Sequence, residues 1–253
     1  MKRLIPMLLV LTAIAVLFAA CGGEATGSSD RPLLIMATSA DFPPFEFWNE
    51  EINDYDGFDI HMARALADIL DMELRIDNMD FGGIIAAVNV GLADIGVAAI
   101  SINKERLESV NFTIPYFETT QVVIVQDASP ITAPDQLDGA RIAVQMGTTS
   151  DLVAEWYLPD DVEIFRFNMA PDVILELNTG RVDAVVIDYA VANEFIAMHP
   201  QLRILDQYLA VEEYAIAVNQ DDTELLNQLN DAIREWLNSP DFTRVYNMFF
   251  GGQ

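Results

Sequence analysis

The sequence predicts an α/β protein made of two similar lobes, and two observations carry this prediction. Strand and helix signals alternate from about residue 31 onward, which is typical of α/β architectures. Residues 83–98 (GIIAAVNVGLADIGVA) and 173–188 (VILELNTGRVDAVVID) also share one plan: an apolar helix, a glycine, an aspartate and an apolar strand. In such a protein we expect the ligand in the crevice where strands end and helices begin.

Each predicted element follows from its hydrophobic pattern. Short apolar runs predict strands at 33–38, 74–77, 93–100, 120–125, 140–145, 162–167, 182–188 and 213–219. Apolar residues at helical spacing predict helices within 58–72, 83–91, 147–157, 171–180, 189–199, 223–237 and 241–249. Asp222 is a suitable N-cap for the helix over 223–237, and Pro240 separates the two C-terminal helices.

The composition is strongly acidic. The chain has 13 Lys and Arg against 40 Asp and Glu, a formal net charge of −27. This balance argues against binding nucleic acid, which needs clustered cations, and against electrostatic docking on anionic lipid. It indicates a solvated surface that keeps the protein soluble. Adaptation to a salty habitat, or a cationic ligand, would also account for the charge.

The N-terminus has the pattern of an export signal. Lys2 and Arg3 precede an apolar run, Leu4 to Ala20, which ends at Cys21, the only cysteine of the chain. This segment resembles a bacterial lipoprotein signal, although Phe18 stands where that pattern usually has leucine. The resemblance implies that residues 1–20 are removed, that Cys21 is lipidated and that residues 21–32 form a flexible tether. An uncleaved anchor helix and an ordinary signal peptide are the alternatives.

No catalytic set is visible in the sequence. His61 and His199 lie where surface residues are expected, and no thiol remains free as a nucleophile once Cys21 is processed. The chain has no GxSxG sequence, no phosphate-binding loop and no metal-ligand spacing. We therefore expect a protein that is not an enzyme and that holds no metal or cofactor.

Six blocks of sequence together resemble the polar amino-acid-binding family of bacterial extracellular solute-binding proteins (family 3), which feed ABC importers. In chain order they are SADFPPFEF (39–47), GFDIHMARALADIL (57–70), MDFGGIIAAVNVGLADI (79–95), ISINKERLESVNFTIPY (100–116), VQMGTTSDLVAEW (144–156) and NTGRVDAVVID (178–188). The resemblance implies the type II periplasmic-binding fold, with a free amino acid held between two closing lobes. It implies an exported monomer that delivers its ligand to a permease, on the outer face of the cell membrane or in the periplasm.

The resemblance also implies the domain boundaries. Lobe 1 comprises residues 33–118 and 214–253, and lobe 2 comprises residues 119–213. Two hinge segments are expected near 118–120 and 210–213.

Arg106 matches the residue that clamps the ligand's carboxylate in this family. A buried amino acid needs a partner for each of its charges, and the rigid guanidinium fork suits a carboxylate. Ser101 adds a hydroxyl group in the same motif, in which Asn103 and Lys104 replace the usual threonine and proline. The alternative is that Arg106 is a surface residue at the start of a helix.

The second lobe is expected to hold the rest of the ligand's main chain. Thr148 and Thr149 match a loop in which hydroxyl and helix N-terminal N–H groups meet the carboxylate. Asp188 matches the acid that binds the ammonium group. Capping of the following helices is the alternative for all three residues.

Weaker matches concern the ligand's side chain. Phe42 and Phe81 match aromatic residues that sandwich its aliphatic part, and the Ala99 carbonyl group matches an acceptor of the ammonium. Ser39 and Gln145 match positions at the distal end of the ligand. Since relatives that select strongly cationic amino acids commonly have an acid in place of Ser39, a neutral polar amino acid is expected here.

Two functions of other classes stay open at this point. One is an exported enzyme on the same fold, such as a dehydratase, which needs an acid–base group in the cleft. The other is a ligand-sensing module.

Overall fold

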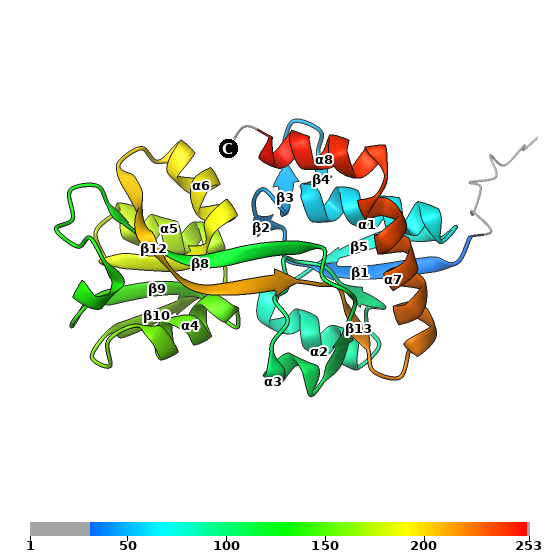
Figure 1. Cartoon of the computed structure of the whole chain (residues 1–253), viewed down its shortest axis with the longest axis horizontal. Coiled ribbons are helices and arrows are strands. Elements are labelled where there is room, and N and C mark those ends of the chain that lie inside the picture. Colours follow the sequence, from blue (N-terminus) through cyan, green and yellow to red (C-terminus); the bar gives the residue numbers. More distant parts are fainter. Residues whose placement is uncertain (1–30, 252–253) are drawn as a thin grey trace, which may run out of the picture. The chain divides into compact units, whose positions relative to one another are not determined.

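Figure 1 shows the computed structural model of the chain, in which residues 31–251 are described. Cys21, the predicted signal peptide and tether residues 21–30 lie outside the described residues. Within residues 31–251, no helix has the length and apolar character needed to cross a bilayer.

The first lobe is built on a five-stranded sheet in the order β5-β1-β6-β13-β7. Its three parallel strands are β1 (Leu33–Thr38), β5 (Glu73–Asn78) and β6 (Ile95–Gly96). Strand β13 (Ala217–Asn219) runs antiparallel to both β6 and β7 (Val110–Phe112). The polypeptide therefore returns from the second lobe to complete this sheet.

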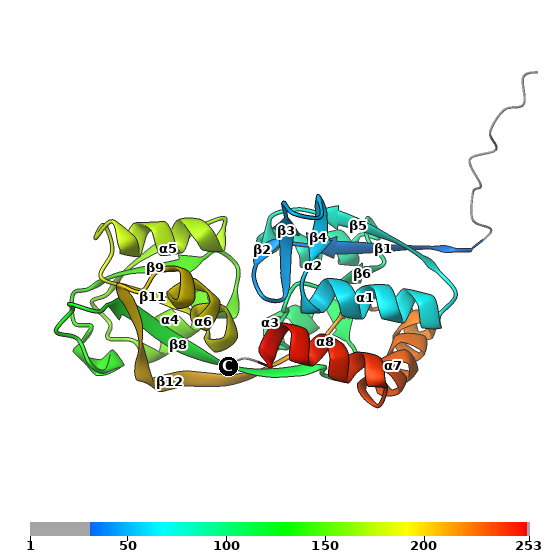
Figure 2. The same ribbon diagram turned by 90° about the horizontal axis from the view of Figure 1, so that it is seen from above.

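The second lobe repeats the plan, with strand order β10-β9-β11-β8-β12. Its parallel strands are β9 (Arg141–Gln145), β10 (Glu163–Phe167) and β11 (Ala184–Asp188). The long strands β8 (Phe117–Gln126) and β12 (Leu202–Tyr214) complete the sheet in antiparallel pairing. In Figures 1 and 2 these two long strands connect the two sheets.

Helices cover both faces of each sheet. In the first lobe they are α1 (Phe58–Ile69), α2 (Ile84–Asn89), α3 (Lys104–Leu107), α7 (Thr223–Leu237) and α8 (Pro240–Phe250). In the second lobe they are α4 (Thr149–Tyr157), α5 (Ala170–Asn178) and α6 (Tyr189–Met198). Two single turns of 3-10 helix, η1 (Phe81–Gly83) and η2 (Pro134–Gln136), complete the set of described helices.

Strand β11 shows why apolar runs without alternation are buried on both faces. Val185 and Ile187 belong to the hydrophobic cluster that contains residues of α5 and α6. Ala184 and Val186 belong to the cluster on the α4 side. Because successive side chains point to opposite faces, a strand covered by helices on both sides must be apolar throughout.

The two halves of the sequence repeat match in structure as well. Asp94 follows α2, and its carboxylate accepts a hydrogen bond from the backbone N–H of Ile35 at 2.7 Å. Asp183 follows α5, and its carboxylate accepts from the backbone N–H of Arg141 at 2.9 Å. The backbone N–H of each aspartate donates in return to the carbonyl of the same partner. Both aspartates thus fasten a helix–strand turn to the neighbouring parallel strand.

Two predicted strands differ from the observed ones. The strand expected at 93–100 is reduced to β6, because Ala99 has a positive φ of 46° that breaks the ladder. The strand expected at 213–219 is divided between the end of β12 and β13. The chain leaves one sheet and enters the other between Tyr214 and Ala217, so a single apolar run serves both lobes.

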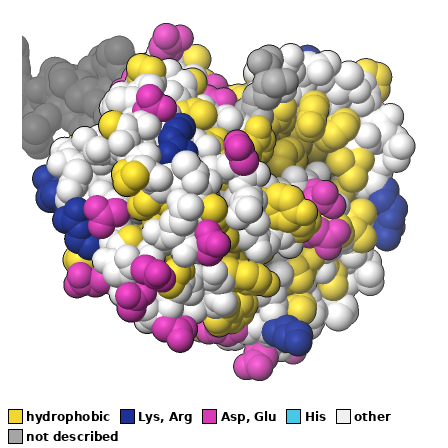
Figure 3. All heavy atoms as spheres, turned by 60° about the vertical axis from the view of Figure 1, so that its left-hand side comes forward, with side chains coloured by type: hydrophobic (Ala, Val, Ile, Leu, Met, Phe, Trp, Pro, Cys, Tyr) yellow, Lys and Arg dark blue, Asp and Glu magenta, His cyan; other side chains and the backbone are white. Residues whose placement is uncertain are grey.

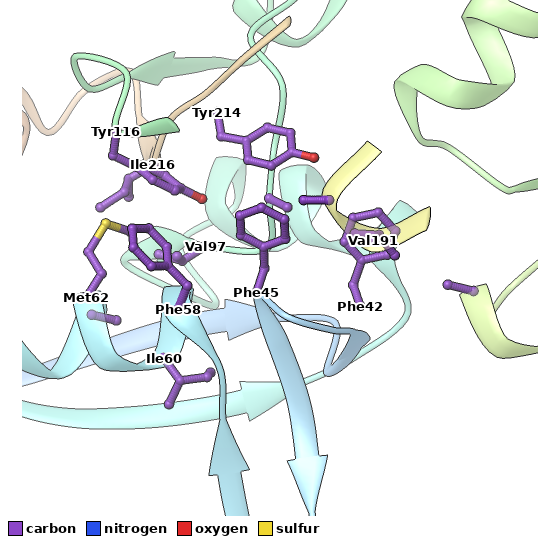
Figure 4. Close-up of a cluster of buried hydrophobic side chains, with 14 of the residues drawn as sticks. Phe42, Phe45, Phe58, Ile60, Met62, Val97, Tyr116, Val191, Tyr214 and Ile216 are labelled. Carbon is purple, nitrogen blue, oxygen red and sulfur yellow. The ribbon is translucent and has the colours of Figure 1, made fainter. Parts of the chain in front are cut away.

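A small sheet that the hydrophobic pattern does not predict lies over the first lobe. Its strands are β2 (Asp41–Phe42), β3 (Glu46–Asn49) and β4 (Asp54–Asp56), in the order β2-β3-β4. Phe45 lies between β2 and β3 and is fully buried. Figure 4 shows it among Phe42, Phe58 and Tyr214. Its ring meets those of Phe58 and Tyr214 edge to face at 6.3 and 5.2 Å, so aromatic packing fixes this sheet to the core.

The segments expected as hinges pair with each other. Thr120, Thr119 and Glu118 on β8 are opposite Val211, Glu212 and Glu213 on β12. Two adjacent, hydrogen-bonded strands allow one lobe to rotate relative to the other while the chain stays extended. The exact division of the chain at residues 118/119 and 213/214 stays a prediction.

The acidic composition is visible on the surface. On the face drawn in Figure 3, acidic side chains are scattered over the surface and hydrophobic side chains line a hollow. This distribution is the one expected of a solvated acidic surface.

Candidate functional site

A cavity of about 280 Å³ lies where the two lobes meet. Its walls come from both lobes and are Asp41, Phe42, Glu46, Phe81, Ala99, Arg106, Gln145, Thr148, Thr149 and Asp188. These walls carry both signs of charge, with Arg106 on one side and acidic side chains around it.

Arg106 is the only cation among the described residues that line the cavity. It lies on α3, a short helix whose N-cap, Asn103, accepts a hydrogen bond from the backbone N–H of Arg106 at 2.8 Å. Its guanidinium donates to the carbonyl of Ser101 at 2.6 Å and, across the cleft, to the carbonyl of Gly147 at 3.1 Å. It also lies 5.2 Å from the ring centroid of Phe81. Asn103 thus caps the short helix that carries Arg106.

Arg106 also differs from the other arginines of residues 31–251. Eight of the ten form an ion pair with Asp or Glu, whereas Arg106 and Arg203 donate to backbone carbonyl groups. Burial lowers the pKa of Arg106 to about 10, against the opposing effect of Glu212 and Asp188, so it stays charged at neutral pH. The surface-residue alternative does not fit a side chain that is only 7% exposed.

Asp188 faces the same cavity from the second lobe. It ends β11 and makes no side-chain capping bond to α6, so the capping alternative does not describe it. The hydroxyl group of Tyr214 donates to its Oδ1 at 2.5 Å. Burial, followed by the negative charge of Glu212, raises the pKa of Asp188 to about 7. A cation beside this carboxyl group would restore its charge.

Thr148 and Thr149 also make no side-chain capping bond to α4. The Thr148 hydroxyl group donates to the carbonyl of Gln145 at 2.7 Å, and the Thr149 hydroxyl group donates to Glu212 Oε2 at 2.6 Å. Both residues line the cavity at the N-terminus of α4, where backbone N–H groups favour an anion.

Glu212 on β12 was not identified from the sequence. Its Oε2 accepts hydrogen bonds from Ser101 at 2.5 Å, Thr149 at 2.6 Å and Gln121 at 3.2 Å. Ser101 belongs to the first lobe and Thr149 to the second, so this hinge carboxylate connects both walls of the cleft. No signal distinguished it in the sequence, because acids are abundant throughout the chain.

Asp41 is a second carboxylate that the sequence did not reveal. The side-chain amide of Gln145 donates to its Oδ2 at 3.2 Å and the backbone N–H of Ala170 donates to the same oxygen at 3.0 Å. The Ser39 hydroxyl group donates to its Oδ1 at 3.2 Å. Burial raises the pKa of Asp41, and these donors counteract the effect. Asp41 thus links β2 of the first lobe to the second lobe.

Glu46 is the third carboxyl group missed from the sequence. It lies at the start of β3, lines the cavity and is 1% exposed. No N–H or O–H group of residues 31–251 donates to either of its oxygens. Burial, the charge of Asp59 and then that of Asp41 raise the pKa of Glu46 well above its usual range. This carboxyl group is the polar group of the cavity that most needs a partner.

The structure brings together eight of the ten ligand-binding residues expected from the sequence. These are Phe42, Phe81, Ala99, Arg106, Gln145, Thr148, Thr149 and Asp188. Ser39 and Ser101 do not line the cavity. Ser39 supports Asp41, whereas Ser101 supports Glu212 with its hydroxyl group and Arg106 with its carbonyl group.

The site has no arrangement suited to a metal ion. Among residues 31–251, no group of three or more His, Cys, Asp and Glu side chains is placed to hold one. The chemistry of the cavity is that of paired charges and hydrogen bonds.

Comparisons with known proteins agree with this geometry. The family model described as bacterial extracellular solute-binding proteins, family 3, matches residues 34–252. A probable histidine-binding protein of Neisseria gonorrhoeae is 31% identical over 267 residues, covering 100% of this chain and 98% of the relative. ABC transporter arginine-binding protein 1 of Escherichia coli K12 is 30% identical over 88% of this chain and 93% of its own length.

Solved structures show the same fold. An ancestral arginine-binding protein bound to arginine superposes with a TM-score of 0.81 at 35% identity, covering 87% of this chain and 99% of that one. The arginine-, lysine-, histidine-binding protein ArtJ from Geobacillus stearothermophilus superposes with a TM-score of 0.80 at 30% identity, covering 86% and 95%. These proteins are two-lobed, so the predicted type II periplasmic-binding fold is confirmed. The chain belongs to the bacterial extracellular solute-binding proteins of family 3.

Proposed function

We propose that the protein binds one free amino acid with a cationic side chain in the cavity between its lobes and presents it to an ABC importer. The observation that carries this proposal is the opposition of Arg106 and Asp188 across one small cavity. A free amino acid has one carboxylate and one ammonium group, and both need partners when water is excluded. The relatives named above as histidine- and arginine-binding proteins support this substrate class.

The ligand's carboxylate is proposed to bind Arg106. Two donor groups of the guanidinium already hold the backbone carbonyls of Ser101 and Gly147, and a guanidinium has five N–H groups. The remaining donors are available to a carboxylate in bidentate geometry. The N-terminus of α4, with Thr148 and Thr149, contributes further donors from the opposite lobe.

The ligand's ammonium group is proposed to bind Asp188 and the carbonyl of Ala99. Ala99 is fixed in its positive-φ conformation because its N–H donates to Asp59 Oδ2 at 2.8 Å. Phe42 and Phe81 then enclose the aliphatic part of the side chain.

Two carboxyl groups of the wall are left for the end of the side chain. Asp41 already has donors, whereas Glu46 has none among the described residues. A guanidinium, ammonium or imidazolium group supplies both charge and N–H donors to Glu46. The preference for a neutral ligand rested on the absence of an acid at Ser39. Asp41 and Glu46 bring acids to the same cavity from neighbouring positions, and they favour a cation.

Ligand binding is proposed to draw the lobes together. A ligand held by Arg106 on one lobe and Asp188 on the other has more contacts when the lobes meet, so it shifts the population toward that state. Glu212, Asp41 and Arg106 are among the residues that make direct contacts across the cleft. The permease is then proposed to recognise the state in which both lobes are joined.

Location and the absence of catalysis belong to the same proposal. We propose that Cys21 is lipidated, that the protein is anchored as a monomer outside the cell membrane and that it catalyses no reaction. The charge pairs of the cavity serve to bind a ligand, and none is arranged with a nucleophile and base.

The role of Asp188 is tested with two ligands and one variant. Asp188→Asn is expected to weaken the binding of L-arginine by about 10- to 150-fold, the equivalent of about 1.5–3 kcal/mol for a hydrogen bond to a charged group. The analogue 5-guanidinopentanoate lacks the ammonium group, so its affinity should change little. Calorimetric titration measures both affinities.

Asp172→Asn is the matched control, since Asp172 is an exposed residue at the start of α5 in the same lobe. It should bind both ligands like the unmodified protein. Equal losses for the two ligands in Asp188→Asn would contradict the assignment of the ammonium group to Asp188.

A further inference from the structure

Glu46 belongs to a buried pair of carboxyl groups that the proposed function uses only in part. Its partner is Asp59, in the first turn of α1, which is fully buried. The two side chains are within hydrogen-bond reach of each other. Asp59 N–H donates to the carbonyl of Phe45 at 2.9 Å, which holds the start of β3 against α1. Gly57 permits this approach, because a Cβ there would lie 2.2 Å from the Phe45 carbonyl oxygen.

Asp59 and Glu46 differ in how many hydrogen-bond donors reach them. Asp59 Oδ2 accepts from the backbone N–H of Ala99 and from the hydroxyl group of Tyr116, both at 2.8 Å. Among residues 31–251, no N–H or O–H donor reaches Asp59 Oδ1 or either oxygen of Glu46. Two ionised carboxylates are acceptors only and cannot bond to each other. One proton on the pair allows a hydrogen bond between the two groups, since a protonated Glu46 donates to the free oxygen of Asp59.

The surrounding charges favour the same arrangement. Three titratable groups of other elements interact electrostatically with the pair: Asp41 on β2, Tyr116 before β8 and Asp188 on β11. Arg106 on α3 lines the same cavity. Carboxyl groups predominate in this set, and they disfavour a second negative charge on the pair. Burial is the main cause of the raised pKa values of both groups. The pKa of Asp59 rises to about 6, and the pKa of Glu46 rises well above its usual range. The proton therefore lies on Glu46, and Asp59 keeps its two donors.

We propose that the cationic side chain of the ligand replaces the proton shared by Glu46 and Asp59, so that binding a cationic amino acid releases this proton to solvent. The inference rests on the proposed function, since it requires the side chain to reach Glu46. In the balanced step, the O–H bond of Glu46 breaks, the proton passes to the buffer and the ligand's cation pairs with the carboxylate. A neutral side chain of the same shape leaves the proton in place, because a protonated Glu46 can donate to it.

The linkage has a definite sign. Proton release on binding means that affinity for the cation increases as pH rises, by up to about tenfold per pH unit while the free pair is protonated. Above the pKa of the pair the affinity no longer changes with pH. Asp188 adds its own proton release when it binds the ammonium group, and this release is common to every free amino acid.

L-arginine and its neutral isostere L-citrulline separate the two effects. Calorimetry at pH 7, where Asp59 is mostly ionised and Glu46 keeps its proton, in buffers of different ionisation enthalpy counts the protons released with each ligand, with competition against arginine if citrulline binds weakly. Arginine is expected to release about one proton more than citrulline. The ammonium group is the same in both ligands, so the contribution of Asp188 cancels in this difference.

Three variants locate the proton. Glu46→Gln should abolish the difference, because its amide cannot ionise. Asp59→Asn provides an independent test that keeps Glu46, since its amide N–H supplies the donor that Glu46 lacks, and it should also reduce the difference. Glu50→Gln, an exposed glutamate four residues from Glu46, should leave the difference unchanged. Circular dichroism verifies that each variant is folded.

The possible results separate this inference from the proposed function. If arginine binds with no more proton release than citrulline, or if Glu46→Gln retains the full difference, the proton exchange is overturned while amino-acid binding stands. If neither ligand binds the unmodified protein, both the exchange and the proposed function are overturned.

Discussion

Arg106→Ala is expected to weaken amino-acid binding by at least about 100-fold. The variant removes two or more hydrogen bonds to the ligand's carboxylate, each contributing about 1.5–3 kcal/mol when the groups are charged. It also leaves the cavity wall with acids and no cation. Arg106→Lys should recover only part of the affinity, because an ammonium group cannot form the bidentate pair. Calorimetric titration with L-arginine measures each effect.

Arg203→Ala is the matched control for this prediction. Arg203 also donates to backbone carbonyls, those of Ser129 at 3.1 Å and Ile131 at 2.5 Å, and it has no ion pair with any residue of 31–251. It lies on β12 and does not line the cavity. Unchanged affinity in Arg106→Ala, or an equal loss in both variants, would contradict the assignment of Arg106 as the carboxylate clamp.

The decarboxylated analogue agmatine refines the same test. Because agmatine lacks the carboxylate, its weaker binding should be insensitive to the loss of Arg106. A large loss of agmatine affinity would mean that Arg106→Ala disturbs the cavity rather than one contact.

Trp236→Ala is expected to lower the free energy of unfolding by about 3–5 kcal/mol. Trp236 on α7 is 1% exposed, and its ring meets those of Phe58 and Phe242 edge to face at 5.6 and 5.2 Å. Its indole N–H donates to Asp241 at 2.9 Å. Truncation leaves a cavity between α1, α7 and α8 that rigid neighbouring elements cannot fill. Urea denaturation measures the loss.

Trp156 offers a control of the same residue type, because it lies on α4 and is 68% exposed. Trp156→Ala should change the free energy of unfolding by less than about 0.5 kcal/mol. Arginine affinity should be the same in both folded tryptophan variants, since neither side chain lines the cavity. Losses of similar size in the two variants would show that burial in this helix layer does not determine stability.

The elements were predictable where the hydrophobic pattern was long. Helix α7 spans the predicted Thr223–Leu237, and Asp222 caps it by accepting from the backbone N–H of Leu225 at 2.9 Å. Asp94 and Asp183 occupy the aspartate position of the repeat found in the sequence, and each exchanges two hydrogen bonds with a neighbouring strand. The sheet β2–β4 was not predictable from pattern, since strands of two to four residues beside two prolines carry almost no periodic signal.

The sequence identified the arginine that lines the cavity but only one of the acidic residues around it. The family resemblance pointed to Arg106 and to Asp188, and both line the cavity. Asp41, Glu46 and Glu212 were not identified from the sequence, because the chain has 40 acidic residues and no sequence signal ranks one above another. Only folding separates them: burial and the lack of donors identify Glu46, and contacts with both lobes identify Glu212.

The contrast between Ser39 and Asp41 bears on the charge of the proposed ligand. A neutral ligand was expected because relatives that select strongly cationic amino acids commonly have an acid in place of Ser39. In the structure Ser39 lies behind Asp41 and donates to it, while Asp41 itself lines the cavity. A shift of two residues along the chain therefore preserves the acidity of the wall.

The central claim is that one cationic amino acid is held between the lobes by Arg106 and Asp188. Its most direct test is a calorimetric titration of the purified protein, unfolded and refolded to remove any ligand, with L-arginine, L-lysine, L-histidine, L-glutamine and L-glutamate. The account predicts binding of one ligand per chain, tightest for a cationic amino acid and absent for glutamate. Binding of glutamate in preference to the cations, or of none of the five, would contradict it.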